Sequence, residues 1–243
     1  MVKIYFLGLG GWASNPFIGH TSFLLASKTT KLLVDAGEGT YSSLRKCTPY
    51  DIGDVDYIFV THIHGDHMLG IPTILQHAKR LGVKVRIVGL EGVYEALRKL
   101  LESVGISKYI NVVDFIKIEE MGRVELGDVG VTTIAAHHTV PSVMIKLDVD
   151  GKCVAYSGDS SPNETFFNQI NGCDVLIHEA SVSDELRDEA MIHGHSSVGD
   201  VVVFAEKSGI KHLILVHRGV KPLIIRRTSL PIVIVYKCDV VDI

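Results

Sequence analysis

The segment at residues 62–67 reads HIHGDH, and an apolar strand is expected to run directly into it. Residues two apart on an extended backbone point to the same side, so His62 and His64 share one face. The glycine that follows permits a sharp turn, after which Asp66 and His67 can aim at a second point nearby. Imidazole and carboxylate groups are ligands that suit zinc and similar divalent ions. Such a dense group of them therefore predicts a metal centre at the end of a strand.

A metal centre needs further ligands, and the candidates follow other apolar strands expected in the chain. His138, Asp159 and His217 each follow such a strand, and Asp35 caps the apolar run at residues 32–34. An Asp that stands alone after an apolar strand is most often a turn residue or a helix cap. It is the shared placement of these residues at strand ends that favours a common site.

The rest of the chain alternates short strands with a few helices. We expect helices at residues 39–46, 68–80, 93–104, 165–170 and 198–207. We expect strands at residues 3–7, 21–26, 31–35, 57–61, 85–88, 112–118, 130–136, 143–149, 152–157, 175–179, 212–216, 232–236 and 240–243. Strands in both halves with helices after them predict an α+β chain built as a four-layer αββα sandwich. No repeat, linker or low-complexity segment divides the chain, so we expect a single domain over residues 1–243.

Composition narrows the classes of function. The 243 residues carry a formal net charge of −4, without the excess of Lys and Arg typical of nucleic-acid-binding domains. No apolar stretch approaches the ~20 residues needed to cross a bilayer, and the N-terminus lacks a signal-peptide pattern. The four cysteines form no CxxC pair, so we expect four reduced, mostly buried thiols. These features predict a cytoplasmic protein without a membrane partner.

With the threonine before it, the histidine-rich segment resembles the THxHxDH motif of the metallo-β-lactamase fold. Further segments resemble ribonuclease Z, the tRNA 3′-processing endonuclease family of that fold, in the same order along the chain. They are LGLGG (7–11), DAGEGT (35–40), IFVT (58–61), MLGIP (68–72), HTVP (138–141), SGD (157–159), HEA (178–180) and GHS (194–196). The resemblance therefore covers essentially the whole chain.

Carried over position by position, the resemblance implies two metal ions and a homodimer. The ions expected are zinc, with Mn or Fe also compatible with these ligands. Asp35 is expected to support the histidine cluster from behind. His137 competes with His138 as the third ligand, and we prefer His138 because Thr-Val-Pro follows it. The implied ligands are His62, His64 and His138 for one ion, Asp66, His67 and His217 for the other, and Asp159 bridging the two.

The chemistry implied by the resemblance is cleavage of a phosphodiester bond. Two divalent ions ~3.5–4 Å apart can clamp a phosphodiester and lower the pKa of a bridging water. Asp66 is expected to orient that water. His195, oriented by Glu179, is the candidate proton donor to the leaving group; alternatively, this pair holds the wall of the site. Arg218 is a candidate for holding the phosphate. The loop at residues 8–15 either cradles a phosphate with its N–H groups or is a plain glycine-rich turn.

Two substrate classes compete. Ribonuclease Z usually carries a long arm between its third ligand motif and the bridging Asp, but here residues 139–158 leave room for one hairpin only. This short connection favours a small cyclic or bis-phosphodiester, whereas the DAGEGT and HEA segments favour the 3′ end of a precursor tRNA, our leading substrate. A thioester or lactam hydrolase, and a metal-binding fold without hydrolase activity, are the remaining alternatives. The complete ligand set argues against the last.

Overall fold

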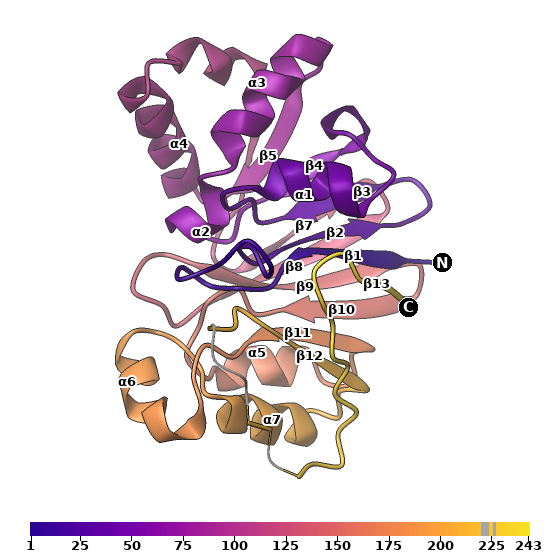
Figure 1. Cartoon of the computed structure of the whole chain (residues 1–243). Helices are drawn as coiled ribbons and strands as arrows, with labels where there is room; N and C mark the ends of the chain where they lie inside the picture. Colours follow the sequence, from indigo (N-terminus) through magenta and orange to yellow (C-terminus); the bar gives the residue numbers. More distant parts are fainter. Residues whose placement is uncertain (220–223, 226) are drawn as a thin grey trace.

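The strands of the protein form two sheets in the computed structural model, which describes residues 1–219, 224–225 and 227–243 (Figure 1). Within these ranges, the first sheet has seven strands in the order β13-β1-β2-β3-β4-β5-β6. Their bounds are β1 Lys3–Gly8, β2 Ser22–Ala26, β3 Lys31–Val34, β4 Tyr57–Phe59, β5 Val85–Gly89, β6 Val113–Lys117 and β13 Val240–Asp242. The first and last strands of the chain therefore pair with each other.

The second sheet has six strands over the same described part of the chain, in the order β12-β11-β10-β9-β8-β7. Their bounds are β7 Gly122–Leu126, β8 Val129–Ala135, β9 Val143–Val149, β10 Lys152–Tyr156, β11 Val175–Glu179 and β12 His212–Val216. Strands β9 and β10 form an antiparallel hairpin. The connection at residues 139–158 therefore holds this one hairpin, as its length predicts.

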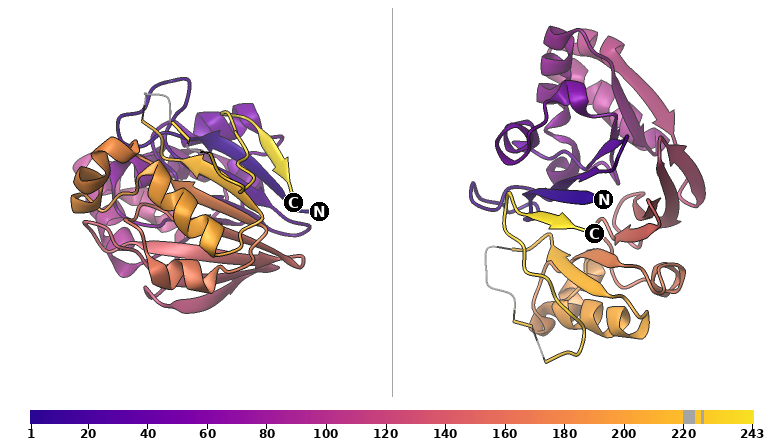
Figure 2. Two further views of the ribbon diagram at one scale, coloured as in Figure 1. Left: turned by 90° about the horizontal axis from the view of Figure 1, so that it is seen from below. Right: turned by 90° about the vertical axis from the view of Figure 1, so that its right-hand side faces the viewer.

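Helices cover the outer face of each sheet (Figures 1 and 2). Helices α1, α3 and α4 pack on the first sheet, and α5 and α7 pack on the second. The α-helices are α1 Thr40–Cys47, α2 Gly65–Met68, α3 Ile71–Leu81, α4 Glu91–Ser103, α5 Glu164–Gln169, α6 Arg187–Ile192 and α7 Val198–Lys207. The 3-10 helices are η1 Ile52–Asp54, η2 Ser107–Val112 and η3 Asp184–Leu186. In the part of the chain that the structure describes, no helix is long and apolar enough to cross a membrane.

Strand β1 shows why the layers stack in this order. Its side chains alternate between two apolar cores: Ile4 and Phe6 lie in the core between the sheets, and Tyr5 and Leu7 lie in the core beneath the helices. Alternate residues of a strand point to opposite faces, so a strand that is apolar on both faces must be covered on both. The predicted four-layer αββα sandwich is confirmed.

The direction of the strands brings the ligand candidates to one edge. Strand β3 runs parallel to β4, and β10, β11 and β12 run parallel to one another. Parallel strands end at the same edge of a sheet. The residues that follow these strands, including the histidine-rich segment after β4, are therefore collected at one side of the sandwich.

Some expected elements differ from the observed ones. The helix expected at residues 68–80 begins later, as α3 at Ile71, and the short helix α2 ends at Met68; between them the Gly70 N–H donates to the Ala36 carbonyl oxygen over 2.8 Å. The strand expected at residues 232–236 is wrong: a single bridge joins Ile232 to Leu213, and no further ladder forms. Strand β7 and helix α6 were not expected, since neither carries a strong apolar period.

The expectation of four reduced thiols is also wrong. Cys47 pairs with Cys238, and Cys153 pairs with Cys173, with Cα–Cα distances of 4.6 and 4.8 Å. The partners of the first pair are 191 positions apart in the sequence. Such a pairing depends on which segments the fold brings together, and the spacing of the cysteines does not reveal it.

Candidate metal centre

The seven side chains predicted as metal ligands lie together where the strands end, and we call them the floor of the site. They form two groups, and the ligand atoms within each group all lie within 4.8 Å of one another. The groups are His62, His64, His138 and Asp159, and Asp66, His67, Asp159 and His217. The Asp159 carboxylate is thus shared by both groups. The competing His137 is exposed and belongs to neither.

Three imidazole nitrogens converge in the first group. His64 Nδ1 lies 3.2 Å from His62 Nε2 and 3.0 Å from His138 Nε2. The remaining ring nitrogen of His138 lies 2.9 Å from the Gly194 carbonyl oxygen, which fixes the orientation of the ring. A carbonyl that accepts from one ring nitrogen leaves the other free to bind a metal ion. The first group therefore has the geometry of a three-histidine site.

In the second group, carboxylates and imidazoles face one another. His217 Nε2 lies 3.1 Å from both Asp66 Oδ2 and Asp159 Oδ2. His67 Nε2 and Asp159 Oδ1 are buried without a hydrogen-bond partner, and 3.4 Å separate them. Leaving such atoms unpaired is costly, and a metal ion bound between them would satisfy both. The donor set therefore fits a divalent cation.

Asp35 holds this group from behind. Its fully buried carboxylate accepts hydrogen bonds from the Thr61 backbone N–H and from the Tyr156 hydroxyl, each over 2.9 Å. His67 Nδ1 lies 2.8 Å from Asp35 Oδ2. An imidazole that donates from Nδ1 to a carboxylate keeps Nε2 free for a metal. Asp35 thus supports His67, as its position directly after β3 predicted.

The charges of the floor favour a cation. Burial alone would lower the pKa of His217, but the carboxylates of Asp159 and Asp66 raise it to about 10. Burial would raise the pKa of Asp66, but the hydrogen bond from His217 and the charge of His67 lower it to about 2. Positive charge is therefore stabilised at this point, and a divalent ion can supply it in place of protons on the imidazoles.

In the first group of ligands, the pKa values of the histidines are lowered and not raised. Burial, with the charge of His67, holds the pKa of His62 well below its usual value. Burial also lowers the pKa of His64 and of His138. Neutral imidazole is the form that binds metal, so these side chains stand ready for an ion without giving up a proton.

Glu179 and His195 form a pair beside the floor. Glu179, the fully buried last residue of β11, lies with Oε1 2.9 Å from His195 Nδ1 and also accepts from the Ser160 N–H. Burial acts to lower the pKa of His195, but the hydrogen bond and charge of Glu179 raise it overall. Ser181 links the pair to the floor, because its hydroxyl donates to Glu179 Oε2 and lies 2.8 Å from His217 Nδ1.

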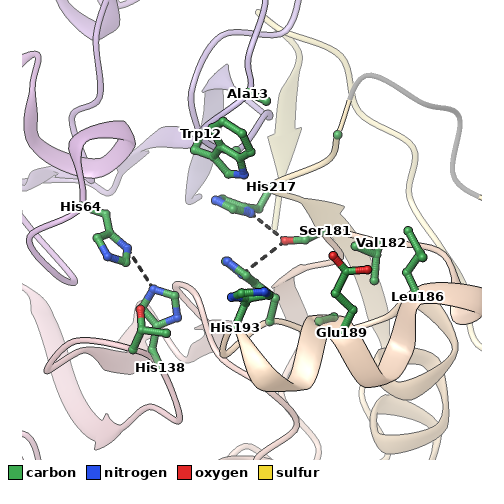
Figure 3. A pocket seen from close by; sticks show the side chains of 15 residues that line it. Trp12, Ala13, His64, His138, Ser181, Val182, Leu186, Glu189, His193 and His217 are labelled. Atoms are coloured by element: carbon green, nitrogen blue, oxygen red, sulfur yellow. Dashed lines mark hydrogen bonds between the residues drawn. The ribbon is translucent and has the colours of Figure 1, made fainter.

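A cavity of about 490 Å³ opens beside the floor (Figure 3). His64, His138 and His217 line this cavity. Six further lining residues, which we call the rim, are Trp12, Val182, Leu186, Glu189, Ala190 and His193. The sequence motifs did not identify the rim or Ser181. The available signal for the rim was a tryptophan placed in a glycine-rich loop.

The phosphate-binding prediction for Arg218 is wrong. Its Nη2 donates to the Val235 carbonyl oxygen over 3.1 Å, and the side chain lines a separate cavity. In the loop at residues 8–15, the N–H groups of Leu9 and Gly10 bond to the carbonyls of Ile18 and Gly19. These N–H groups are not available to a phosphate, which favours the interpretation of this part of the loop as a turn.

Fold and site together define a class of protein. A family model described as a Beta-lactamase superfamily domain matches residues 30–218, and the chain belongs to this family. The metallo-β-lactamase fold protein YhfI from Bacillus subtilis has the same fold, with a TM-score of 0.83 and 19% identity over 100% of both chains. Hydrolases of this fold bind divalent metal ions, as the two groups of ligands suggest.

Within this class, the chain resembles ribonuclease Z. The ribonuclease Z of Methanocaldococcus jannaschii is 28% identical to it, over 89% of this chain and 86% of that protein. The crystal structure of the short form of human tRNase Z matches with a TM-score of 0.81 and 23% identity, over 99% of this chain and 98% of the other. The predictions of the fold and of a ribonuclease Z-like, metal-dependent hydrolase are confirmed.

Proposed function

We propose that the protein is a two-metal phosphodiesterase that cuts RNA at its 3′ end, with precursor tRNA as the leading substrate. The observation that carries the proposal is the Asp159 carboxylate, which is shared by two groups of ligand atoms. Two-metal sites of this kind clamp a phosphodiester and serve in-line displacement. The relatives named ribonuclease Z, which the chain matches over most of their length, support RNA as the substrate.

We assign the seven side chains of the floor as the metal ligands. Zinc is the proposed ion, because imidazole and carboxylate ligands suit it, and Mn or Fe are compatible with the same donors. When bound, such a pair of ions supplies a hydroxide at neutral pH and neutralises charge on the phosphate. The unpartnered Asp159 Oδ1 and His67 Nε2 support this assignment.

The residues of the chain then have separate tasks. Asp66 orients the attacking water, because its low pKa keeps it an acceptor at neutral pH. His195 gives a proton to the leaving oxygen, since the raised pKa keeps its ring protonated further towards neutral pH. Glu179 holds the His195 ring through Nδ1. This leaves Nε2 as the atom that donates the proton.

A small cyclic or bis-phosphodiester is the second candidate substrate. The connection at residues 139–158 contains the β9–β10 hairpin and has no room for a tRNA-gripping arm. Moreover, none of the described residues that line the two cavities at the floor is Lys or Arg. A long polyanion usually needs such side chains, so these observations favour a small ester.

One comparison tests the proposal and separates the two substrates. Zinc-loaded protein is assayed on a tRNA precursor with a 3′ trailer and, separately, on bis(p-nitrophenyl) phosphate and on cyclic nucleotides. A single cut at the trailer is expected. Activity on the small esters without that cut would move the function to the second candidate, and activity on neither, by protein that holds two zinc ions, would overturn both.

The ligand assignment has its own test. We expect His64→Ala to lose at least one of the two zinc ions, measured by elemental analysis of the purified protein. His212→Ala is the matched control, because this exposed histidine lies on β12 away from the cavities and should leave the zinc content unchanged. A His64→Ala protein that keeps two ions per chain would overturn the assignment.

Three further features belong to the proposal. The chain acts as one domain over residues 1–243, supported by the core that joins the two sheets. It forms a homodimer, which light scattering tests directly. It works in the cytoplasm. Disulfides persist inside cells chiefly in hyperthermophilic organisms. With its two disulfides, a cytoplasmic location of this protein therefore fits such an organism best.

A further inference from the structure

We propose that Trp12 is a stacking platform for a nucleobase attached to the scissile phosphate. The inference rests on the proposed function, because the phosphate has to lie at the floor. It goes beyond that function by naming what the substrate carries next to the phosphate: a planar aromatic base. The base can belong to the end of an RNA or to a single nucleotide, and its chemistry is the same in both.

Trp12 lies where a ligand at the floor can reach it. The indole is 79% exposed, yet it lines both cavities that border the floor. His217 lines the same two cavities (Figure 3). A large apolar side chain left in water gains free energy when a ligand covers it. A ligand bound in either cavity at the floor can therefore contact the indole.

The backbone that leads into Trp12 is held in place, and this positions the indole at the floor. Leu9 N–H donates to the Ile18 carbonyl, and Gly10 N–H donates to the Gly19 carbonyl, over 2.9 and 2.8 Å. His20 Nδ1 lies 3.0 Å from the Gly11 carbonyl oxygen. A Cβ on Gly11 would lie 2.5 Å from His217 Cε1. Gly11 therefore lies against His217, and little backbone order has to be gained at this point when a base stacks on the indole.

The rest of the cavity wall decides which kind of ligand fits. Val182, Leu186 and Ala190 give it an apolar surface, and the one acidic side chain of the rim is Glu189. In the described lining no Lys or Arg offsets that carboxylate. Glu189 disfavours a second phosphate beside it, whereas an uncharged ring would lie between apolar groups. The wall thus favours a base and disfavours further phosphates at this point.

Size and stacking energy agree with a base. The cavity of about 490 Å³ lies within the ~300–1,000 Å³ range of sites that bind small molecules. Stacking on an aromatic side chain suits every base, because each base presents a π-face. The platform therefore predicts affinity for nucleotides with little preference among bases.

The chain offers a direct readout, since Trp12 is its only tryptophan. Zinc-loaded protein is titrated with adenosine 5′-monophosphate and, separately, with ribose 5-phosphate, while tryptophan fluorescence is recorded. We expect saturable quenching by the nucleotide and none by the sugar phosphate. Equal quenching by both, or none by either at millimolar concentration, would overturn the proposal. A short oligoribonucleotide that quenches at lower concentration assigns the base to an RNA end; equal midpoints assign it to a single nucleotide.

Kinetics give the second test. For the p-nitrophenyl ester of thymidine 5′-phosphate, Trp12→Ala should raise KM roughly tenfold, as expected when one base loses its stacking partner, and Trp12→Phe should restore most of the loss. For methyl p-nitrophenyl phosphate, which shares the p-nitrophenyl leaving group but has no base, the rise in KM should be clearly smaller than for the thymidine ester. Phe17→Ala is the matched control, because Phe17 is 86% exposed in the same loop and lines neither cavity.

The two proposals fail in different ways. Protein that quenches with the nucleotide but hydrolyses no phosphodiester would remove the proposed function and keep the base-binding site. Protein that hydrolyses both esters, with equal KM changes on Trp12→Ala, would keep the function and remove the site.

Discussion

The floor and the rim of the site are built from different parts of the fold and differ in burial and charge. On the floor, His62, His67 and Asp159 are buried, and a neighbouring polar group orients most of the rings. On the rim, Trp12 and Leu186 are largely exposed and belong to a loop and to the 3-10 helix before α6. The floor concentrates titratable groups, whereas the rim is mainly apolar.

This difference separates chemistry from specificity. Side chains that hold a cation have to be fixed and desolvated, and strand ends inside a sandwich provide both. A surface that receives a substrate has to remain open to solvent. Variants of the floor should therefore act on metal binding and on kcat, and variants of the rim should act on KM.

The largest effect is expected from Asp159→Asn. Loss of the shared carboxylate charge should reduce the zinc content below two ions per chain and lower kcat by roughly a thousandfold, the size of effect seen when a group that stabilises the transition state is removed. Elemental analysis and hydrolysis of bis(p-nitrophenyl) phosphate measure the two changes. Asp114→Asn, at an exposed position on β6, is the control. A variant with full zinc content and unchanged kcat would contradict the role of Asp159.

The next largest effect concerns the pair beside the floor. His195→Ala should lower kcat by roughly a hundredfold, within the usual range for loss of a general acid, and leave the zinc content unchanged. Loss of zinc in this variant would instead make His195 part of the floor.

A change of pH separates the tasks of His195 and Glu179. The proposed proton donor would be lost as pH rises through the pKa of His195, which Glu179 raises. In Glu179→Gln the pKa should fall back, so the decline of kcat on the alkaline side should begin at a lower pH than in the unmodified protein. A pH profile of kcat on bis(p-nitrophenyl) phosphate measures this. An alkaline limb at the same pH in both proteins would restrict Glu179 to holding the wall.

The floor could be predicted from the sequence because its chemistry is local. His62, His64, Asp66 and His67 stand within one turn after a strand, and strand direction brings the remaining candidate ligands to the same edge. The four-layer fold followed from apolar runs of strand length. The rim could not be predicted, because its residues come from a loop before β2 and from a short segment around α6, and only the folded chain brings them together.

The same limit explains the individual errors. Arg218 follows a ligand in the sequence, but its side chain turns to Val235. The cysteines meet through the packing of α1 against the C-terminal segment and of residue 173 against β10. In each case sequence position gives the neighbour along the chain, whereas the partner in space depends on how distant segments pack.

A smaller effect is expected from Asp35→Asn, which acts through His67. The amide should weaken the hydrogen bond to His67 Nδ1. Zinc affinity should fall about 10–100-fold, the usual range for loss of a group that orients a metal ligand. Competition with a chromogenic chelator measures it. Tyr156→Phe removes one donor to the same carboxylate and should change the affinity less. If both variants bind zinc as tightly as the unmodified protein, the floor does not depend on this support.

Removal of the Cys47–Cys238 disulfide should have the smallest effect on activity. It should also separate the rim from the floor most sharply. The C-terminal segment that this disulfide anchors supports the rim loop, because Lys237 Nζ donates to the Pro16 carbonyl over 3.4 Å. Replacing both cysteines by serine should lower Tm by roughly 5–15 °C, since a disulfide contributes a few kcal/mol. It should raise KM for the thymidine ester a few-fold and leave the zinc content at two.

The control is replacement of Cys153 and Cys173, which close a loop of only 20 positions and should lower Tm less, with no change in KM. A loss of zinc in the first variant but not in the second would mean that this disulfide supports the floor as well, and that the two regions are mechanically coupled.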